Sequence, residues 1–281
     1  MARIAICAPS TPFTRDDADR VLALASAEFP RHELVFHEQC FAVEGHFAGS
    51  DALRLSALLE CANDPAFDAV WFVRGGYGAN RIAAQAVASM NTAARGKSYC
   101  GYSDAGYLLA ALYRAEIGVV AHGPMPVDIR RDGGDVAVGR TLAWFDDYMA
   151  GLEPSLDPWG DDGGAVAFNL MTLAMLVGTE LMPDLSNHVV LVEEVSEHLY
   201  AIDRLLFHVT HHLAPMGIAG LRLGRISDVP ENDRAFGSEP TDMARFWCER
   251  TGIAYLGRAD IGHDAANKIV PFGVASATLR P

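Results

Sequence analysis

The chain has 281 residues, about the length of two ordinary domains, and half of these residues are hydrophobic. Its 22 basic and 36 acidic residues give a formal net charge of −14, without any basic tract, which excludes nucleic acids and anionic membranes as expected partners. The first residues lack the charged and apolar regions of a signal peptide, and no apolar run approaches the ~20 residues of a membrane span. We therefore expect a globular, cytoplasmic protein.

Short β-rich runs alternate with helical patterns in the first half of the chain. This alternation predicts a parallel, doubly wound sheet with helices on both faces. Helices are expected to begin near Thr14, Ser50 and Asn80, and another is expected over residues 136–149. The expected strands are residues 2–8, 32–37, 67–74, 98–103 and 118–122.

A Gly-, Pro- and Asp-rich stretch follows the last of these helices and predicts a linker. We expect a first domain over residues 1–150, a linker over 151–165 and a second domain over 166–281. Periodicity alone indicates a smaller α+β domain in the second half. Its expected helices are residues 167–178, 201–213 and 243–251, and its β-like stretches are residues 188–195, 220–227 and 274–281.

The sequence GYSDAG places Ser103 where the fourth strand ends and a helix begins. Gly101 and Ala105 are small enough for the sharp turn that presents a nucleophilic hydroxyl, although a helix N-cap is the alternative role for such a serine. The backbone N–H of Asp104 could then stabilise a developing oxyanion. Cys100 also lies nearby, but its position inside the strand favours a packed thiol over a nucleophile.

A second loop, RGGYG at residues 74–78, follows the third strand. Ligands bind beyond the carboxyl ends of such strands, so we expect this loop and the Ser103 turn to face one crevice. Gly75 and Gly76 would let backbone N–H groups approach a substrate, although a tight turn needing positive φ is the alternative. The loop lacks the glycine spacing of a dinucleotide site.

Two sets of histidines are candidates for chemistry. His208, His211 and His212 share one expected helix and could bind a metal, but no H-E-x-x-H glutamate accompanies them, which favours a solvated face. The five cysteines are scattered without any CxxC pair, so we expect free thiols and no metal site. His263 follows Gly262 in a late loop, where catalytic groups are commonly mounted.

Glu193 and Glu194 close the expected strand at residues 188–195. Strand side chains alternate, so only one of the two carboxylates can face a given site. A glutamate at the end of a buried strand requires a partner, and this partner could be functional or an ordinary salt bridge. HGPM, at His122 to Met125, follows the fifth strand and either lines the same pocket or simply turns the chain.

The order of these motifs resembles the serine LD-carboxypeptidase family, which includes murein tetrapeptide carboxypeptidases and microcin C immunity peptidases. The motifs are CAPSTP, VWFVRGGYGANR, GYSDAG, HGPM, the helix with Asn169, VEEVSE with YAIDRLL, and GH with PFG. The resemblance implies an α/β fold, with a flavodoxin-like parallel sheet in the N-terminal domain and a smaller swivelling β/α C-terminal domain. Ala167-Phe168 and Glu194 depart from the family pattern, which puts the pocket shape near the domain seam in doubt.

By resemblance, Ser103 is the nucleophile, His263 the base and Glu193 the acid that orients it. Asp104 and Gly76 would supply the oxyanion-hole N–H groups. The implied reaction cleaves the bond before a terminal D-alanine in a murein-derived peptide, without a metal or organic cofactor. The resemblance also implies a homodimer. Hydrolysis of a peptidyl or aminoacyl nucleotide and a non-catalytic ligand-binding module remain alternatives.

Overall fold

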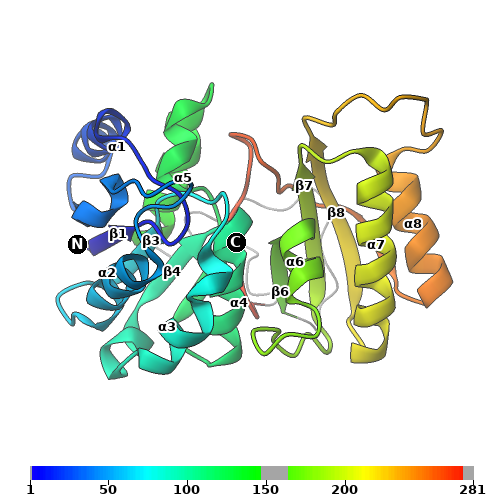
Figure 1. Cartoon of the computed structure of the whole chain (residues 1–281), viewed down its shortest axis with the longest axis horizontal. Helices are drawn as coiled ribbons and strands as arrows, with labels where there is room; N and C mark the ends of the chain where they lie inside the picture. The colour runs from blue at the N-terminus through cyan, green and yellow to red at the C-terminus, as the bar shows by residue number, and fades with distance from the viewer. Residues whose placement is uncertain (1, 147–163, 275–281) are drawn as a thin grey trace.

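Two α/β domains lie side by side, each built around its own sheet (Figure 1). The computed structural model describes residues 2–146 and 164–274. The first sheet has the strand order β10-β5-β4-β3-β1-β2 and is parallel except for β10. Its strands are β1 (Arg3–Cys7), β2 (Glu33–Phe36), β3 (Ala69–Phe72), β4 (Ser98–Gly101), β5 (Val119–His122) and β10 (Val270–Pro271).

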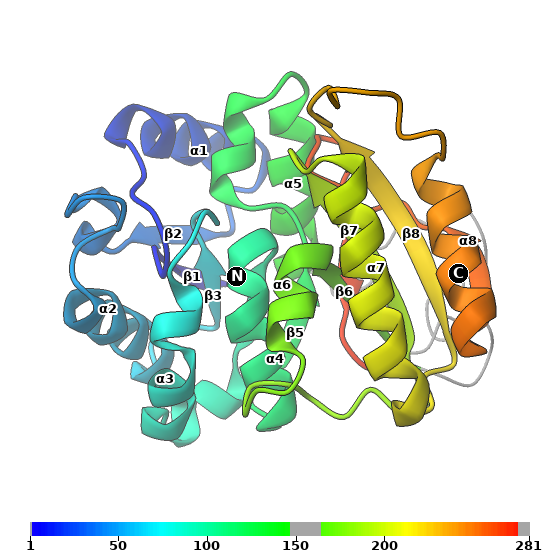
Figure 2. The same ribbon diagram turned by 45° about the vertical axis from the view of Figure 1, so that its right-hand side comes forward.

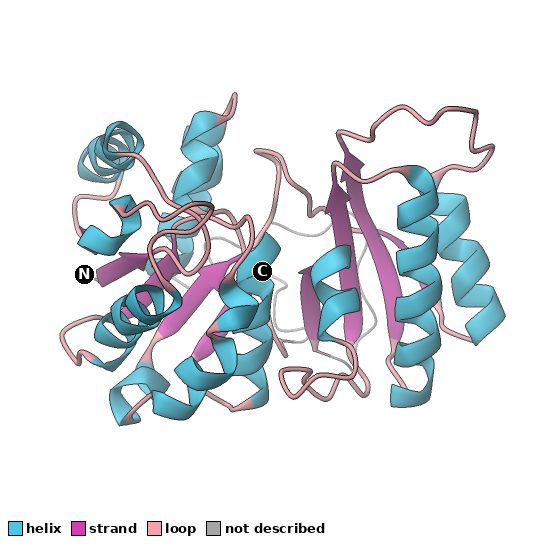
Figure 3. Ribbon diagram, in the orientation of Figure 1, coloured by secondary structure: helices cyan, strands magenta, loops and turns pink. Residues whose placement is uncertain are grey.

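Helices cover both faces of this sheet because its strands are apolar on both sides. Ile4 and Ile6 of β1 pack with one set of helices, and Ala5 and Cys7 pack with the other. The first set is α1 (Arg15–Glu28) and α5 (Gly134–Asp146), and the second is α2 (Asp51–Asn63), α3 (Ala83–Ser89) and α4 (Gly106–Arg114). Figure 3 shows this doubly wound arrangement, which confirms the fold predicted for the first half.

The second sheet is fully parallel, so the α+β arrangement indicated by periodicity is wrong and the α/β class is confirmed. Its strand order is β6-β7-β8-β9, and helices α7 and α8 pack beside each other (Figure 2). The elements are β6 (Ala165–Asn169), α6 (Leu170–Leu176), β7 (Val189–Val195), α7 (Leu199–Leu213), β8 (Gly220–Ser227), α8 (Pro240–Thr251) and β9 (Tyr255–Arg258).

Strand β6 occupies the start of the segment for which a single helix was expected. Val166 and Phe168 are buried on one face of β6, and Ala165 and Ala167 on the other. A strand buried on both faces has no alternating pattern, so sequence periodicity does not separate it from the helix that follows. Asn169 ends the strand and caps α6 by accepting a hydrogen bond from the Thr172 N–H.

The end of the described chain returns to the first domain. Strand β10 pairs antiparallel with β5, and the segment that carries it runs between the two sheets (Figure 1). The predicted linker limits remain a prediction, because they fall between Asp146 and Ala165, mostly outside the described residues. The last predicted β-like stretch also lies outside them beyond residue 274. No helix in the described ranges is long and apolar enough to cross a membrane.

Candidate active site

Ser103 begins the short 3-10 helix Ser103–Ala105 that joins β4 to α4. Its backbone φ of 59° is unusual for a residue with a side chain and is of the kind found where a sharp turn exposes a functional group. The neighbouring Asp104 N–H lies in the first turn of this helix, where N–H groups have no partner within the helix. The turn can therefore present both a hydroxyl and a free N–H.

The RGGYG loop approaches this turn closely through Gly75. A Cβ atom added to Gly75 would lie 2.8 Å from Ser103 Oγ and 3.2 Å from the Asp104 backbone nitrogen. Gly76 has a φ of 106°, and its N–H has no acceptor within the part of the chain described here. Thr11 of the CAPSTP segment fixes the loop, because its hydroxyl donates to the Gly75 carbonyl at 2.6 Å.

The Asp104 carboxylate joins the loops around the turn. It accepts hydrogen bonds from the Ser10 hydroxyl and, at 2.9 Å, from the Ala79 N–H. Burial raises the pKa of Asp104, although these hydrogen bonds oppose the rise. The sequence singled out only the backbone of Asp104, but the side chain also has a structural role, because it holds the first loop, the RGGYG loop and the turn together.

Glu193, near the end of β7, contacts His263 directly. Its Oε2 lies 2.6 Å from His263 Nδ1, and the glutamate side chain is fully buried. Burial disfavours the charged imidazole, but the charge and hydrogen bond of Glu193 outweigh it and raise the pKa of His263. A carboxylate on Nδ1 fixes the ring so that Nε2 is left available for proton transfer.

Glu194 points to a different set of partners, as strand alternation requires. Its carboxylate accepts hydrogen bonds from Asn169 Nδ2 at 2.6 Å and from the Met171 N–H at 2.8 Å. Burial raises the pKa of Glu194, and these hydrogen bonds oppose the rise. Glu194 therefore holds the start of α6, and Glu193 alone of the pair contacts His263.

Tyr102 brings the serine turn next to His263. Its ring centroid lies 4.8 Å from that of His263, and its hydroxyl donates to Asp128 Oδ1 at 2.8 Å. No hydrogen bond joins Ser103 to His263 within the described residues, as is common for catalytic pairs in ligand-free enzymes. Sequence reasoning assigned no role to Tyr102, which lies within GYSD, or to Asp128, which follows HGPM by three residues.

The other sequence candidates remain apart from this site. Burial raises the pKa of the Cys100 thiol, which suits a packed side chain. The rings of His208 and His212 are tilted to each other, with centroids 4.4 Å apart on the surface of α7. The Nδ1 atoms of His211 and His212 bond backbone carbonyls one turn earlier. In the described ranges, no group of three or more His, Cys, Asp or Glu side chains could hold a metal ion.

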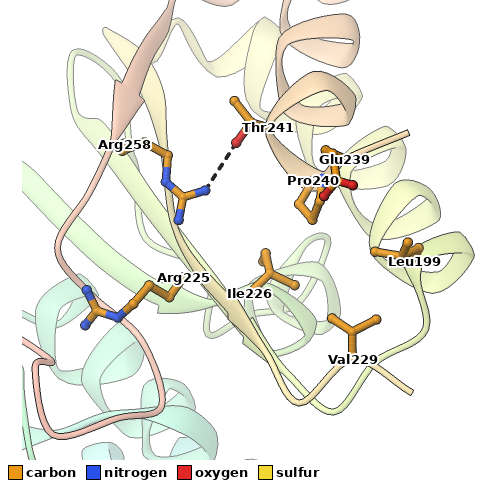
Figure 4. Close-up of a pocket in the computed structure, with 8 residues that line it drawn as sticks. All are labelled: Leu199, Arg225, Ile226, Val229, Glu239, Pro240, Thr241 and Arg258. Atoms are coloured by element: carbon orange, nitrogen blue, oxygen red, sulfur yellow. Dashed lines mark hydrogen bonds between the residues drawn. The ribbon is translucent and has the colours of Figure 1, made fainter. Parts of the chain in front are cut away.

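A separate cavity of about 380 Å³ lies in the second domain, beside the start of α8 (Figure 4). Arg258 donates to the Thr241 hydroxyl at 3.2 Å within it. Arg225 also lines the cavity, but its guanidinium binds Asp260 and Asp264, which precede and follow His263 in the sequence. Neither Ser103 nor Glu193 lines this cavity, so it is distinct from the candidate active site.

The chain matches two models of one protein family. Residues 4–123 match the LD-carboxypeptidase N-terminal domain, and residues 162–278 match the LD-carboxypeptidase C-terminal domain. The fold and the two matches together define a hydrolase built from two α/β domains. The chain belongs to the LD-carboxypeptidase family, which confirms the resemblance seen in its motifs.

Individual relatives agree with this assignment. The murein tetrapeptide carboxypeptidase of Pseudomonas aeruginosa is 24% identical over 284 residues, which cover 96% of this chain and 91% of the relative. The structure of muramoyltetrapeptide carboxypeptidase from Oxalobacter formigenes is 26% identical, with a TM-score of 0.76 over 96% of this chain and 92% of that one. The microcin C7 self-immunity protein MccF, bound to glutamyl sulfamoyl guanosine, shares the fold, with 17% identity, a TM-score of 0.77, and 99% and 94% coverage.

Proposed function

We propose that this protein is a serine carboxypeptidase in which Ser103, His263 and Glu193 form the catalytic triad. The observation that carries the proposal is the buried contact of 2.6 Å between Glu193 Oε2 and His263 Nδ1. The His263 ring also packs against Tyr102, the residue before Ser103. The strained backbone of Ser103 supports its role as the nucleophile.

In the proposed reaction, His263 Nε2 takes the proton of Ser103 as Oγ attacks the carbonyl of the terminal peptide bond. The protonated His263 then donates this proton to the departing amine, and an acyl-enzyme remains on Ser103. Water, activated by the same histidine, hydrolyses the ester and restores the serine. The chemistry requires no metal or organic cofactor.

Two backbone N–H groups are proposed to bind the oxyanion of the tetrahedral intermediate. Asp104 N–H is adjacent to the nucleophile, and Gly76 N–H lies in the loop whose Gly75 contacts the Ser103 side chain. Each donor of this kind contributes on the order of 10²–10³ in turnover in serine peptidases.

The proposed substrate is a murein-derived tetrapeptide that ends in D-alanine. Cleavage of the L,D bond before this residue releases the D-alanine. This substrate is supported by relatives named as murein and muramoyltetrapeptide carboxypeptidases. A homodimer, as implied by the family resemblance, and the cytoplasmic location expected from the sequence are also part of the proposal. The predicted linker is short and has Trp159 as its one aromatic residue, which favours a peptide over a nucleotide substrate. Trp159 lies outside the described residues.

The decisive test is hydrolysis of a tetrapeptide panel by the wild-type protein and by Ser103→Ala and His263→Ala. Each variant should lose several orders of magnitude in turnover while keeping its folded circular dichroism spectrum, because triad members act as a unit. Activity should withstand EDTA. Wild-type turnover by a folded Ser103→Ala variant would overturn the assignment of Ser103 as the nucleophile. If the wild-type protein itself cleaved none of the peptides, the non-catalytic ligand-binding role would be favoured.

A further inference from the structure

The loop that carries His263 lies between two anchors, one in each domain. On one side, the Arg225 N–H donates to the Ile261 carbonyl at 2.8 Å, which attaches the loop to β8 of the second sheet. On the other side, Val270 pairs with His122 of β5 in the first sheet. The position of His263 relative to Ser103 therefore depends on how this crossing segment is held.

One buried side-chain pair connects the loop to the strand beside the nucleophile. His122 Nε2 lies 3.0 Å from Asn267 Oδ1, and the same oxygen accepts the Gly262 N–H at 3.2 Å. Both side chains are fully buried. His122 is the register partner of Gly101 on β4, two residues before Ser103. These contacts link Gly262, the residue immediately before His263, to the strand pair that supports Ser103.

The donor and acceptor roles in this connection follow from the backbone. The Gly262 N–H can only donate, so the Asn267 atom facing it must be the carbonyl oxygen. That oxygen can only accept, so His122 must carry its proton on Nε2. Asn267 Nδ2 has no hydrogen-bond partner among the described residues, and the oxygen is the part of the amide that is used.

His122 remains neutral in this setting. Burial lowers its pKa to about 4, although the charge of Glu193 and the Asn267 bond oppose the shift. The Tyr102 ring packs against the His122 ring with centroids 5.5 Å apart. The positive charge of His263, when that residue is protonated, also disfavours protonation of His122. A neutral Nε2–H donor is thus available throughout the pH range in which His263 would act as a base.

We propose that His122 and Asn267 form a cross-domain hydrogen-bond relay that positions His263 against Ser103. His122 would be a positioning residue, which acts through Asn267 and the Gly262 peptide and does not touch the substrate. This assigns a role to the HGPM motif, and it rests on the proposed function of Ser103 and His263. Because the relay spans the seam, it would make the alignment of the base sensitive to the first domain as well as the second.

Two amide substitutions separate this role from simple packing. His122→Gln places an amide nitrogen near the original Nε2 position and keeps the donor, whereas His122→Asn is shorter and cannot reach Asn267. We expect His122→Gln to retain kcat within about threefold. His122→Asn should lose on the order of tenfold to a hundredfold in kcat with little change in KM, as for a small misplacement of a catalytic group.

A measurement that needs no substrate accompanies the kinetics. The proton shared by His263 Nδ1 and Glu193 should give a strongly downfield NMR resonance, which His122→Gln should keep and His122→Asn should shift or broaden. If the wild-type protein cleaves none of the peptides, the proposed function fails, while this resonance still tests the relay.

The relay is wrong if His122→Asn keeps both the wild-type kcat and the wild-type resonance, or if the Gln and Asn variants are equally impaired. Should His122→Asn fail to fold, the comparison passes to the other partner. Asn267→Asp keeps acceptor oxygens for Gly262 and His122 and should retain the His263 resonance, whereas Asn267→Ala should lose it. Equal behaviour of those two variants would also contradict the proposal.

Discussion

Gly75 has a conformation that other residues can adopt, so its requirement for glycine is one of space. Its backbone approaches Ser103 so closely that a single methyl group would contact the nucleophilic oxygen. The next residue, Gly76, is restricted in two ways, because its φ of 106° is strained for any side chain and an added Cβ would lie 2.6 Å from Thr11 Cγ2. Only at Gly75 does the restriction come from the nucleophile itself.

We expect Gly75→Ala to reduce kcat/KM at least about a hundredfold, or about 2.7 kcal/mol of transition-state stabilisation. The added Cβ, 2.8 Å from Ser103 Oγ, would displace the hydroxyl or the loop. Gly96→Ala is the matched control, because a Cβ there has no atom within 4 Å. Steady-state kinetics on both proteins test this, and equal activities would show that the hydroxyl can move aside at no cost.

The adjacent glutamates provide a second residue-scale prediction. His263 must be neutral to act as a base, and Glu193 raises its pKa, so the rate should increase with pH through that raised value. Glu193→Gln removes the negative charge, so the acidic limb of the kcat/KM profile should move to lower pH while the plateau falls by orders of magnitude.

Glu194→Gln is the control for this substitution, because Glu194 bonds the start of α6 and does not contact His263. It should leave the limb nearly in place and lower mainly the thermal stability. A pH–rate profile from pH 4 to 9 compares the two variants. A larger shift in the Glu194 variant would exclude Glu193 as the orienting acid.

Sequence reasoning succeeded where one residue carries its own signal. Strand alternation separated Glu193 from Glu194, and the small residues around Ser103 indicated the turn in which the structure places it. Asn267 could not be found in this way, because its importance comes from two partners, one of them 145 positions away. A buried amide has no periodicity, and only the fold shows what it joins.

At the scale of elements, the short strand β10 matters more than its two residues indicate. The chain after it places Phe272 between the domains, with ring centroids 5.5 Å from Tyr113 of α4 and 5.2 Å from Phe168 of β6. The sequence did not indicate this pairing, because an antiparallel strand supplied from beyond the last strand of the second sheet leaves no local pattern. Its apolar side chains are consistent with any buried turn.

Phe272→Ala should therefore lower the free energy of unfolding by about 3–5 kcal/mol, as expected for a buried aromatic side chain. Phe246→Ala, which removes the same ring from a position 47% exposed on α8, should cost much less. Urea denaturation of the two variants provides the comparison. Similar urea midpoints for the two variants would mean that the segment after β10 contributes little to the packing of the two domains against each other.

At the scale of the whole molecule, the proposed site is divided between the domains. Ser103 lies at the end of the first sheet, whereas Glu193 lies on the second sheet and His263 on the segment that crosses between them. Thr172 of α6 donates to the Ser103 carbonyl at 3.3 Å, so the second domain also contacts the turn that carries Ser103. The alternation of strands and helices predicted the first unit, whereas periodicity misassigned the second as α+β. The mutual placement of the two units depends on contacts that periodicity does not encode.

A site assembled from two domains should use binding energy from the whole peptide to align its catalytic groups. Truncation of the substrate should then lower kcat as well as raise KM. We expect a tetrapeptide ending in D-alanine to be cleaved at its last bond and its all-L counterpart to resist. A dipeptide with only the scissile bond should react at least about a hundredfold more slowly in kcat/KM, or some 2.7 kcal/mol.

Steady-state kinetics on these three compounds test the substrate and the domain seam separately. Equal rates for the D- and L-terminated tetrapeptides would exclude the LD-carboxypeptidase activity and leave the proposed triad intact. If the dipeptide differed from the tetrapeptide only in a higher KM, the remote residues of the tetrapeptide would contribute to binding without aligning the catalytic groups. A loss in kcat would instead show that the bulk of the peptide brings Ser103 and His263 into register, because only interactions stronger in the transition state accelerate the chemical step.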